Sequence, residues 1–158
     1  MITFNTFFPE LAIDEMRVLH INGMGVVPDD EYGLVEFYCD EIDCDCRRVI
    51  INVVSHKSGK FLASISYGWE SLQFYEKWTG NRKDAEEAIG PYLDPLNEQS
   101  DYAPLFLRLF IEHVLPDTNY IERLKRHYHL FKSEIKRKQS PLKLLQSKGK
   151  SKRWRLKK

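Results

Sequence analysis

The sequence predicts an α+β domain: an antiparallel β-meander of three to four strands covered by C-terminal helices, followed by a flexible basic tail. Of the 158 residues, 42% are hydrophobic and 13% aromatic, which is enough for one buried core. Residues 17–67 alternate with the period of strands, and the apolar period becomes that of helices after Gly68. A run of strands followed by a run of helices is typical of α+β proteins.

The predicted sheet occupies residues 17–67. Each of its segments is rich in β-branched or aromatic residues, which favour strands. The strands are expected at residues 17–21, 34–39, 46–56 and 61–67. Turns such as Ser58-Gly59-Lys60 separate them. Connections this short favour antiparallel pairing, because a parallel crossover needs about a dozen residues.

Four helices are predicted after the sheet. They are expected at residues 70–79, 83–89, 101–115 and 117–136. The first ends at Gly80 and the second at Gly90-Pro91, which are common stop signals. Pro104 is compatible with the third because it lies in the first turn. The last has apolar residues at spacings of three and four, namely Ile121, Leu124, Tyr128, Phe131 and Ile135.

The charge separates an acidic body from a basic tail. The whole chain has a net charge of +1, but residues 132–158 contain twelve Lys or Arg and one Glu. Residues 1–131 therefore carry a net charge of −10. We predict a single domain over residues 1–138 and a basic, disordered tail over residues 139–158.

The tail predicts non-specific contact with nucleic acid. Trp154 lies between Arg153 and Arg155, where an indole can stack on a base while the cations bind phosphates. Counterion release drives such binding whatever the base sequence. The predicted contact residues are Lys148, Lys150, Lys152, Arg153, Trp154, Arg155, Lys157 and Lys158. A tail that only aids solubility, or that folds onto the acidic body, is the alternative.

The composition also indicates a cytoplasmic protein without a membrane span. The N-terminus lacks the basic and apolar regions of a secretory signal. The longest apolar run, near residues 49–54, is much shorter than the roughly 20 residues of a spanning helix. Three cysteines, an odd number, do not form the disulfide framework of a small secreted domain.

Cys39, Cys44 and Cys46 form a candidate metal site where two predicted strands meet. If Cys39 and Cys46 flank the turn and Cys44 folds inward, the three thiolates supply three ligands of a tetrahedral zinc ion. A histidine or an acid from another segment is expected to supply the fourth, and such a closed site would be structural. The spacing C-x4-C-x-C differs from the common C-x2-C zinc knuckle.

Three other interpretations of these cysteines stay open. Cys39 is in phase with Val35 and Phe37, which we interpret as the core-facing side of a strand, so the cysteines are core residues in the first. In the second, Arg47 and Arg48 lower the pKa of a redox or nucleophilic thiol. In the third, the aspartates of the loop bind a hard cation.

Two helical segments are interpreted as structural. The aromatic residues of segment 67–78 are expected to pack a helix onto the sheet. Segment 123–129 presents Arg123 and His127 one helical turn apart, which predicts a solvated basic face.

Several blocks of the sequence resemble a family of uncharacterised bacterial proteins. The blocks are Tyr38-Cys39-Asp40-Glu41, Cys44-Asp45-Cys46-Arg47-Arg48-Val49, Tyr67-Gly68-Trp69-Glu70-Ser71, Phe74-Tyr75, Gln99-Ser100 and Arg126-His127-Tyr128. The resemblance spans about residues 32–131. Many such proteins end in a SEC-C motif, a zinc-binding, cysteine-rich tail associated with nucleic acid or with the secretion machinery. Here no cysteine or histidine follows His129, and the resemblance implies no known activity.

The sequence thus favours a non-enzymatic binding protein whose tail contacts nucleic acid and whose cysteine-rich hairpin holds a structural zinc ion. One alternative is a small enzyme or thiol-redox protein that uses Cys39, Cys44 and Cys46. The other is an adaptor that binds proteins through its acidic body. No Walker loop, G-x-G-x-x-G, H-E-x-x-H or G-x-S-x-G motif points to a specific reaction.

Overall fold

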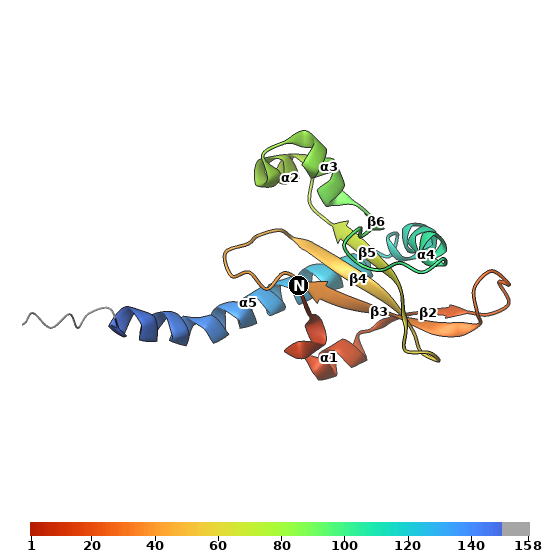
Figure 1. The fold of residues 1–158 in the computed structure, drawn as a ribbon, viewed down its shortest axis with the longest axis horizontal. Helices are drawn as coiled ribbons and strands as arrows, with labels where there is room; N and C mark the ends of the chain where they lie inside the picture. Colours follow the sequence, from red (N-terminus) through yellow and green to blue (C-terminus); the bar gives the residue numbers. More distant parts are fainter. Residues whose placement is uncertain (150–158) are drawn as a thin grey trace, which may run out of the picture.

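The computed structural model describes the backbone of residues 1–149 and the side chains of residues 1–138. Its centre is a six-stranded antiparallel sheet in the order β1-β3-β4-β5-β6, with β2 paired to the same edge of β3 as β1 (Figure 1). The strands are β1 (Ile2–Thr3), β2 (Arg17–Ile21), β3 (Asp30–Tyr38), β4 (Arg48–Ser55), β5 (Phe61–Gly68) and β6 (Tyr92–Leu93).

The helices stand mostly after the sheet in the chain, so the predicted α+β class is confirmed. They are α1 (Pro9–Asp14), α2 (Leu72–Thr79), α3 (Arg82–Ile89), α4 (Ala103–Leu109) with a π-helical turn (Phe110–Val114), and α5 (Thr118–Gly149). The short elements β1, β6 and α1 were not predicted. A strand of two residues carries no measurable alternation, and only tertiary pairing defines it.

One face of the sheet packs against α4 and α5. The residues of β3 and β4 that point to this face are buried, and they alternate with half-buried ones. Tyr32 lies 4.8 Å from Phe106 of α4, and Tyr38 lies 5.7 Å from Phe131 of α5, measured between ring centroids. Four residues of the predicted α5 stripe are buried: Leu124, Tyr128, Phe131 and Ile135. The core therefore lies between β3–β5 and the two C-terminal helices.

The predicted phase of β3 was wrong. Its core-facing residues are Tyr32, Leu34, Glu36 and Tyr38, whereas Val35 and Phe37 lie on the opposite face. The charged Glu36 among them is 7% exposed and has buried partners, which the alternation of apolar residues did not reveal. Cys39 consequently continues the face opposite the main core.

Helices α2 and α3 form a small pair beyond the end of β5 (Figure 1). Tyr75 of α2 and Ala85 and Ala88 of α3 make a separate buried cluster. Each helix of the pair has a side-chain N-cap. Ser71 caps α2 and Asn81 caps α3, and their side chains accept hydrogen bonds from the backbone N–H groups of Phe74 and Asp84 respectively. The aromatic segment packs only partly as predicted: Tyr67 and Trp69 pack against the main core, Phe74 and Tyr75 pack within the α2–α3 pair, and Trp78 is 42% exposed.

Gly68 fixes how closely the α2–α3 pair approaches β5. A Cβ atom there would overlap the hydroxyl of Tyr75 and lie 2.6 Å from the carbonyl oxygen of Ala88. We expect Gly68→Ala to lower the free energy of unfolding in urea by about 1–3 kcal/mol, because backbone must move. Gly33→Ala is the control, since its Cβ would meet only the flexible Met16 side chain. Equal losses would contradict the steric explanation.

Helix α5 is longer than predicted and continues through residues 139–149 without a break at Lys138 (Figure 1). The part of the tail at residues 150–158 lies outside the described residues. Over the part of the chain that is described, no helix combines the length and the apolar composition needed to cross a bilayer.

Candidate metal centre

The loop between β3 and β4 brings the three cysteines together. Their Sγ atoms all lie within 4.8 Å of one another, and all three thiols are free. Cys39 directly follows β3, Cys46 precedes Arg48 at the start of β4, and a turn from Glu41 to Cys44 folds the third thiol inward. Cys46 is buried and the other two are half-buried. The predicted approach of Cys39, Cys44 and Cys46 is confirmed, and these atoms can hold a metal ion.

Lys132 of α5 forms hydrogen bonds with the first half of this loop. Its ammonium group is 2.6 Å from the carbonyl oxygen of Glu41 and 3.2 Å from that of Cys39, to which it donates hydrogen bonds. The lysine is only 8% exposed. A buried ammonium group needs such partners, so the loop and the helix depend on each other for polar contacts.

Arg47 stabilises the second half of the loop through its contacts, and its own backbone conformation is unusual. Its φ is 48°, in the left-handed region that a non-glycine residue adopts at a cost of about 1–2 kcal/mol. Its N–H donates to the hydroxyl of Tyr128 (3.3 Å) and its carbonyl accepts from Tyr75 (2.8 Å). Its guanidinium group pairs with Asp45 and Glu70. These contacts hold the turn that directs Cys44 and Cys46 to the same point.

Two of the three thiols, those of Cys44 and Cys46, have a raised pKa. Burial, together with Cys44 and Cys39, raises the pKa of Cys46 to about 12. Burial and Cys39 also raise the pKa of Cys44. Arg47 points toward carboxylates and Arg48 toward two hydroxyl groups. The structure therefore does not support the lowered thiol pKa on which the redox interpretation depends.

The expected fourth protein ligand is missing from the cluster. Within the described residues, no histidine, aspartate or glutamate brings a ligand atom close enough to join the three sulfur atoms. The predicted closed shell is thus incomplete, because the nearby helix contributes Lys132 and Tyr128 on this side rather than a ligand.

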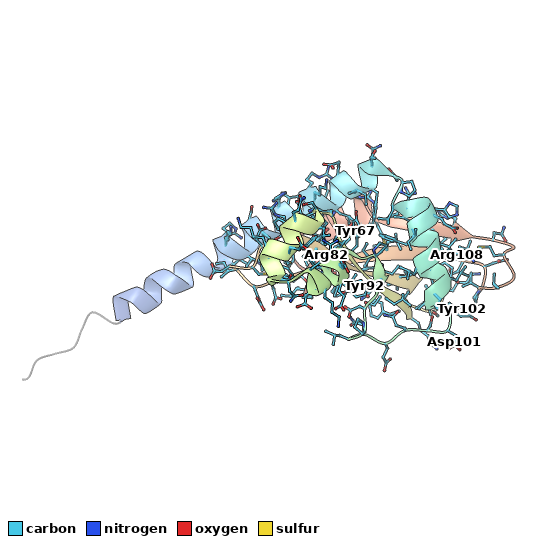
Figure 2. All side chains as sticks on the ribbon, turned by 90° about the horizontal axis from the view of Figure 1, so that it is seen from above. Tyr67, Arg82, Tyr92, Asp101, Tyr102 and Arg108 are labelled. Carbon is cyan, nitrogen blue, oxygen red and sulfur yellow. The ribbon has the colours of Figure 1, made fainter. Side chains whose placement is uncertain are left out.

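An open groove begins at the cysteines. All three line one end of a cavity of about 390 Å³ on the face of the sheet opposite the main core. Ile50, Ser66 and Tyr92 form its floor, since they are adjacent in the register of β4, β5 and β6. Figure 2 shows Tyr92 on the segment between α3 and α4. A ligand in this groove would reach the cysteines from outside the protein.

None of the predicted nucleic-acid-binding side chains lies in the described part of the structure. Lys148 lies within α5, but its side chain is outside the described part. Lys150, Lys152, Arg153, Trp154, Arg155, Lys157 and Lys158 all lie outside the described residues.

The predicted solvated face of α5 was wrong at His127. This residue is 1% exposed, and its Nδ1 and Nε2 each lie 2.7 Å from a carboxylate oxygen, of Glu36 and Glu15 respectively. Its ring stacks on Phe4 at 4.1 Å between centroids. The four-residue spacing from Arg123 did not reveal this burial, because Glu15 and Glu36 are distant in sequence.

Comparison with known proteins identifies no relative of this chain. No protein-family model matches the chain, and searches of curated proteins and of solved structures find no significant match. The resemblance to a family with SEC-C tails therefore stays a prediction, and function rests on the geometry of the chain itself.

Proposed function

We propose that this protein is a zinc-binding protein in which Cys39, Cys44 and Cys46 hold one Zn²⁺ ion as thiolates. The observation that carries the proposal is the mutual approach of three sulfur atoms within 4.8 Å. A tetrahedral zinc ion with Zn–S bonds of about 2.3 Å separates its sulfur ligands by about 3.8 Å. Small side-chain rotations suffice to reach that geometry.

Chemistry favours zinc over a hard cation at this position. Thiolates are soft ligands that select zinc or copper(I) rather than calcium or magnesium. Two of the loop's three aspartates have other partners: Asp45 pairs with Arg47, and Asp40 with the terminal ammonium group. A bound cation also offsets the cost of placing thiolates side by side around the buried Cys46, whose pKa is raised by burial and by the neighbouring thiols.

Elemental analysis of protein purified without a histidine tag tests the proposal. We expect about one equivalent of zinc per chain and a lower melting temperature after treatment with a chelator, because metal binding energy contributes to folding. Less than about a tenth of an equivalent, with a melting temperature unmoved by chelator, would exclude a zinc site.

Lys132 should affect zinc binding without touching the ion. We expect Lys132→Met to weaken zinc binding about 10–100-fold, because the carbonyl groups of Cys39 and Glu41 lose their common donor and the loop loses its orientation. Competition with a chromophoric chelator measures the affinity. Lys136→Met, at an exposed position one turn further along α5, is the matched control. Similar affinities for both variants would show that Lys132 does not position the loop.

We also propose that the basic C-terminal segment contacts nucleic acid. The supporting observation is the charge separation, with twelve Lys or Arg and one Glu in residues 132–158. Helix α5 carries the chain through residue 149, beyond the sheet (Figure 1). The basic segment thus starts on a helix that leaves the acidic body, which makes a contact with a polyanion sterically feasible.

A gel-shift assay over a salt series tests this second proposal. A chain ending at Gly149 should bind more weakly than the full chain, and its slope of log affinity against log salt should be shallower by roughly 0.9 for each phosphate that residues 150–158 neutralise. Trp154→Ala in the full chain separates stacking from charge, since it should weaken binding at an unchanged slope. An unchanged affinity and slope after truncation would refute binding through residues 150–158.

A further inference from the structure

We propose that the groove beside the cysteines binds a small organic ligand with an anionic oxygen group, a carboxylate or a phosphate, which completes the coordination of the metal ion and pairs with Arg48. This inference rests on the proposed zinc site and names the ligand class that the site accepts.

The coordination number leaves one position for such a ligand. Zinc in proteins is usually four-coordinate, and three thiolates occupy three of its positions. No fourth ligand atom from the described residues joins the cluster, while all three cysteines line the groove. The remaining position of the ion therefore faces a cavity of about 390 Å³, a volume within the usual range for small-molecule sites.

The start of β4 brings a cation to the same groove. Cys46 and Arg48 stand on either side of the turn at Arg47, and both line the groove. The Nη2 atom of Arg48 donates to the hydroxyl groups of Ser66 (2.6 Å) and Tyr92 (2.8 Å). These two contacts hold the guanidinium group over β5 and β6, within the groove.

Arg48 retains an uncompensated charge. Both of its hydrogen-bond partners are neutral hydroxyl groups, and among the described residues no carboxylate pairs with it. Its Nε is buried without a partner. The buried Asp94, which also lines the groove, accepts instead from the backbone of Leu96 and from Asn97. A guanidinium group without a carboxylate partner favours bidentate binding of a carboxylate or phosphate ligand.

The charge of the metal centre is the reason that Arg48 matters for an anionic ligand. A zinc ion with three thiolates carries one net negative charge, so a fourth anionic ligand is repelled unless a cation lies nearby. Arg48 supplies that cation. Trp78 and Leu96 add exposed apolar surface to the wall, 42% and 92% exposed, which suits the organic part of the ligand. The site therefore suits a small organic acid or phosphate that contacts both the metal ion and Arg48.

Cobalt substitution tests the inference with acetate and inorganic phosphate as probes. Co²⁺ bound by thiolates absorbs visibly, and its bands respond to the fourth ligand. We expect acetate, phosphate or both to shift the bands in a saturable manner, and the anion that acts shows which group the site prefers. Arg48→Gln should weaken that binding at least about tenfold, while Arg48→Lys keeps part of it. Arg82→Gln, an exposed arginine of α3, is the matched control.

The outcomes separate this inference from the zinc proposal. Absence of cobalt–thiolate absorption in the wild-type protein would refute the zinc proposal itself. Cobalt–thiolate absorption that neither anion shifts would leave the metal site standing and overturn the inference. An Arg48→Gln variant that binds cobalt and titrates with the anion like the wild type would also overturn it, because the ligand then does not use Arg48.

Discussion

Replacing Cys44 by Ser should remove the metal and with it a large part of the protein's stability. We expect zinc content to fall from one equivalent to less than about a tenth, and the free energy of unfolding to fall by about 4 kcal/mol at free zinc a thousandfold above the dissociation constant. Cys44 is only half-buried, so the substitution by itself removes little packing. The measurements are elemental analysis and chemical unfolding at fixed free zinc.

A chelator separates the metal from the packing of the side chain. With zinc removed, wild-type and Cys44→Ser proteins should unfold within about 1 kcal/mol of each other, because only the small polar change remains. Asp43→Asn is the control on the same loop: its exposed carboxylate is outside the cluster, so it should retain one equivalent of zinc. A Cys44→Ser protein that still binds zinc would show that the other thiols suffice.

His127→Ala should strongly destabilise the protein, because His127 is buried where α5 packs on the sheet. His127 lies between Glu36 and Glu15, and Tyr38 also donates to Glu36 at 2.8 Å. Removing the imidazole leaves the carboxyl group of Glu36, which is 7% exposed, without this hydrogen-bond partner. Leaving a buried polar group unpaired costs about 1–3 kcal/mol, and more for a charged group, and thermal or urea unfolding at neutral pH measures the loss.

Two comparisons isolate the effect of the buried pair. His129→Ala, at an exposed position two residues away, should change stability by no more than about 0.5 kcal/mol. Combining His127→Leu with Glu36→Leu should recover most of the loss, because no uncompensated charge remains. If the double variant is less stable than His127→Ala, shape rather than charge dominates at this position.

The buried network also predicts how stability depends on pH. Partial burial opposes ionisation of Glu15, but hydrogen bonds from His127 and Arg126 outweigh it and lower the pKa of that carboxyl group. A lowered pKa in the folded protein means that its contribution is present above the ordinary pKa of glutamate. That contribution is lost as the pH falls through the lowered value.

The fold was largely predictable because apolar residues recur with a clear strand or helix period in its main elements. Strands β2 to β5 and helices α2 to α5 follow from alternation, stop signals and apolar stripes. The two-residue strands β1 and β6 follow only from pairing with Tyr38 and Ser66, which no local pattern contains. The face of β3 was predicted incorrectly because Glu36 occupies a core position, and its partner His127 is 91 residues away.

The candidate site was predictable in its ligands but not in its surroundings. Three cysteines within one turn indicate a metal site from spacing alone. The residues that position them, Lys132, Tyr128 and Tyr75, lie on helices distant in sequence and appear in no motif. The open fourth position that we propose depends on the tertiary arrangement of the groove, whereas the sequence suggested a closed, structural centre.

X-ray absorption at the zinc edge of the zinc-loaded full chain tests the central claim most directly, because it counts the ligand atoms around the ion. We predict three sulfur atoms at about 2.3 Å and one oxygen or nitrogen at about 2.0 Å. A first shell with no more than one sulfur atom would contradict binding by Cys39, Cys44 and Cys46. Four sulfur atoms would contradict the open position, since the chain has only three cysteines and a second chain would have to supply the fourth.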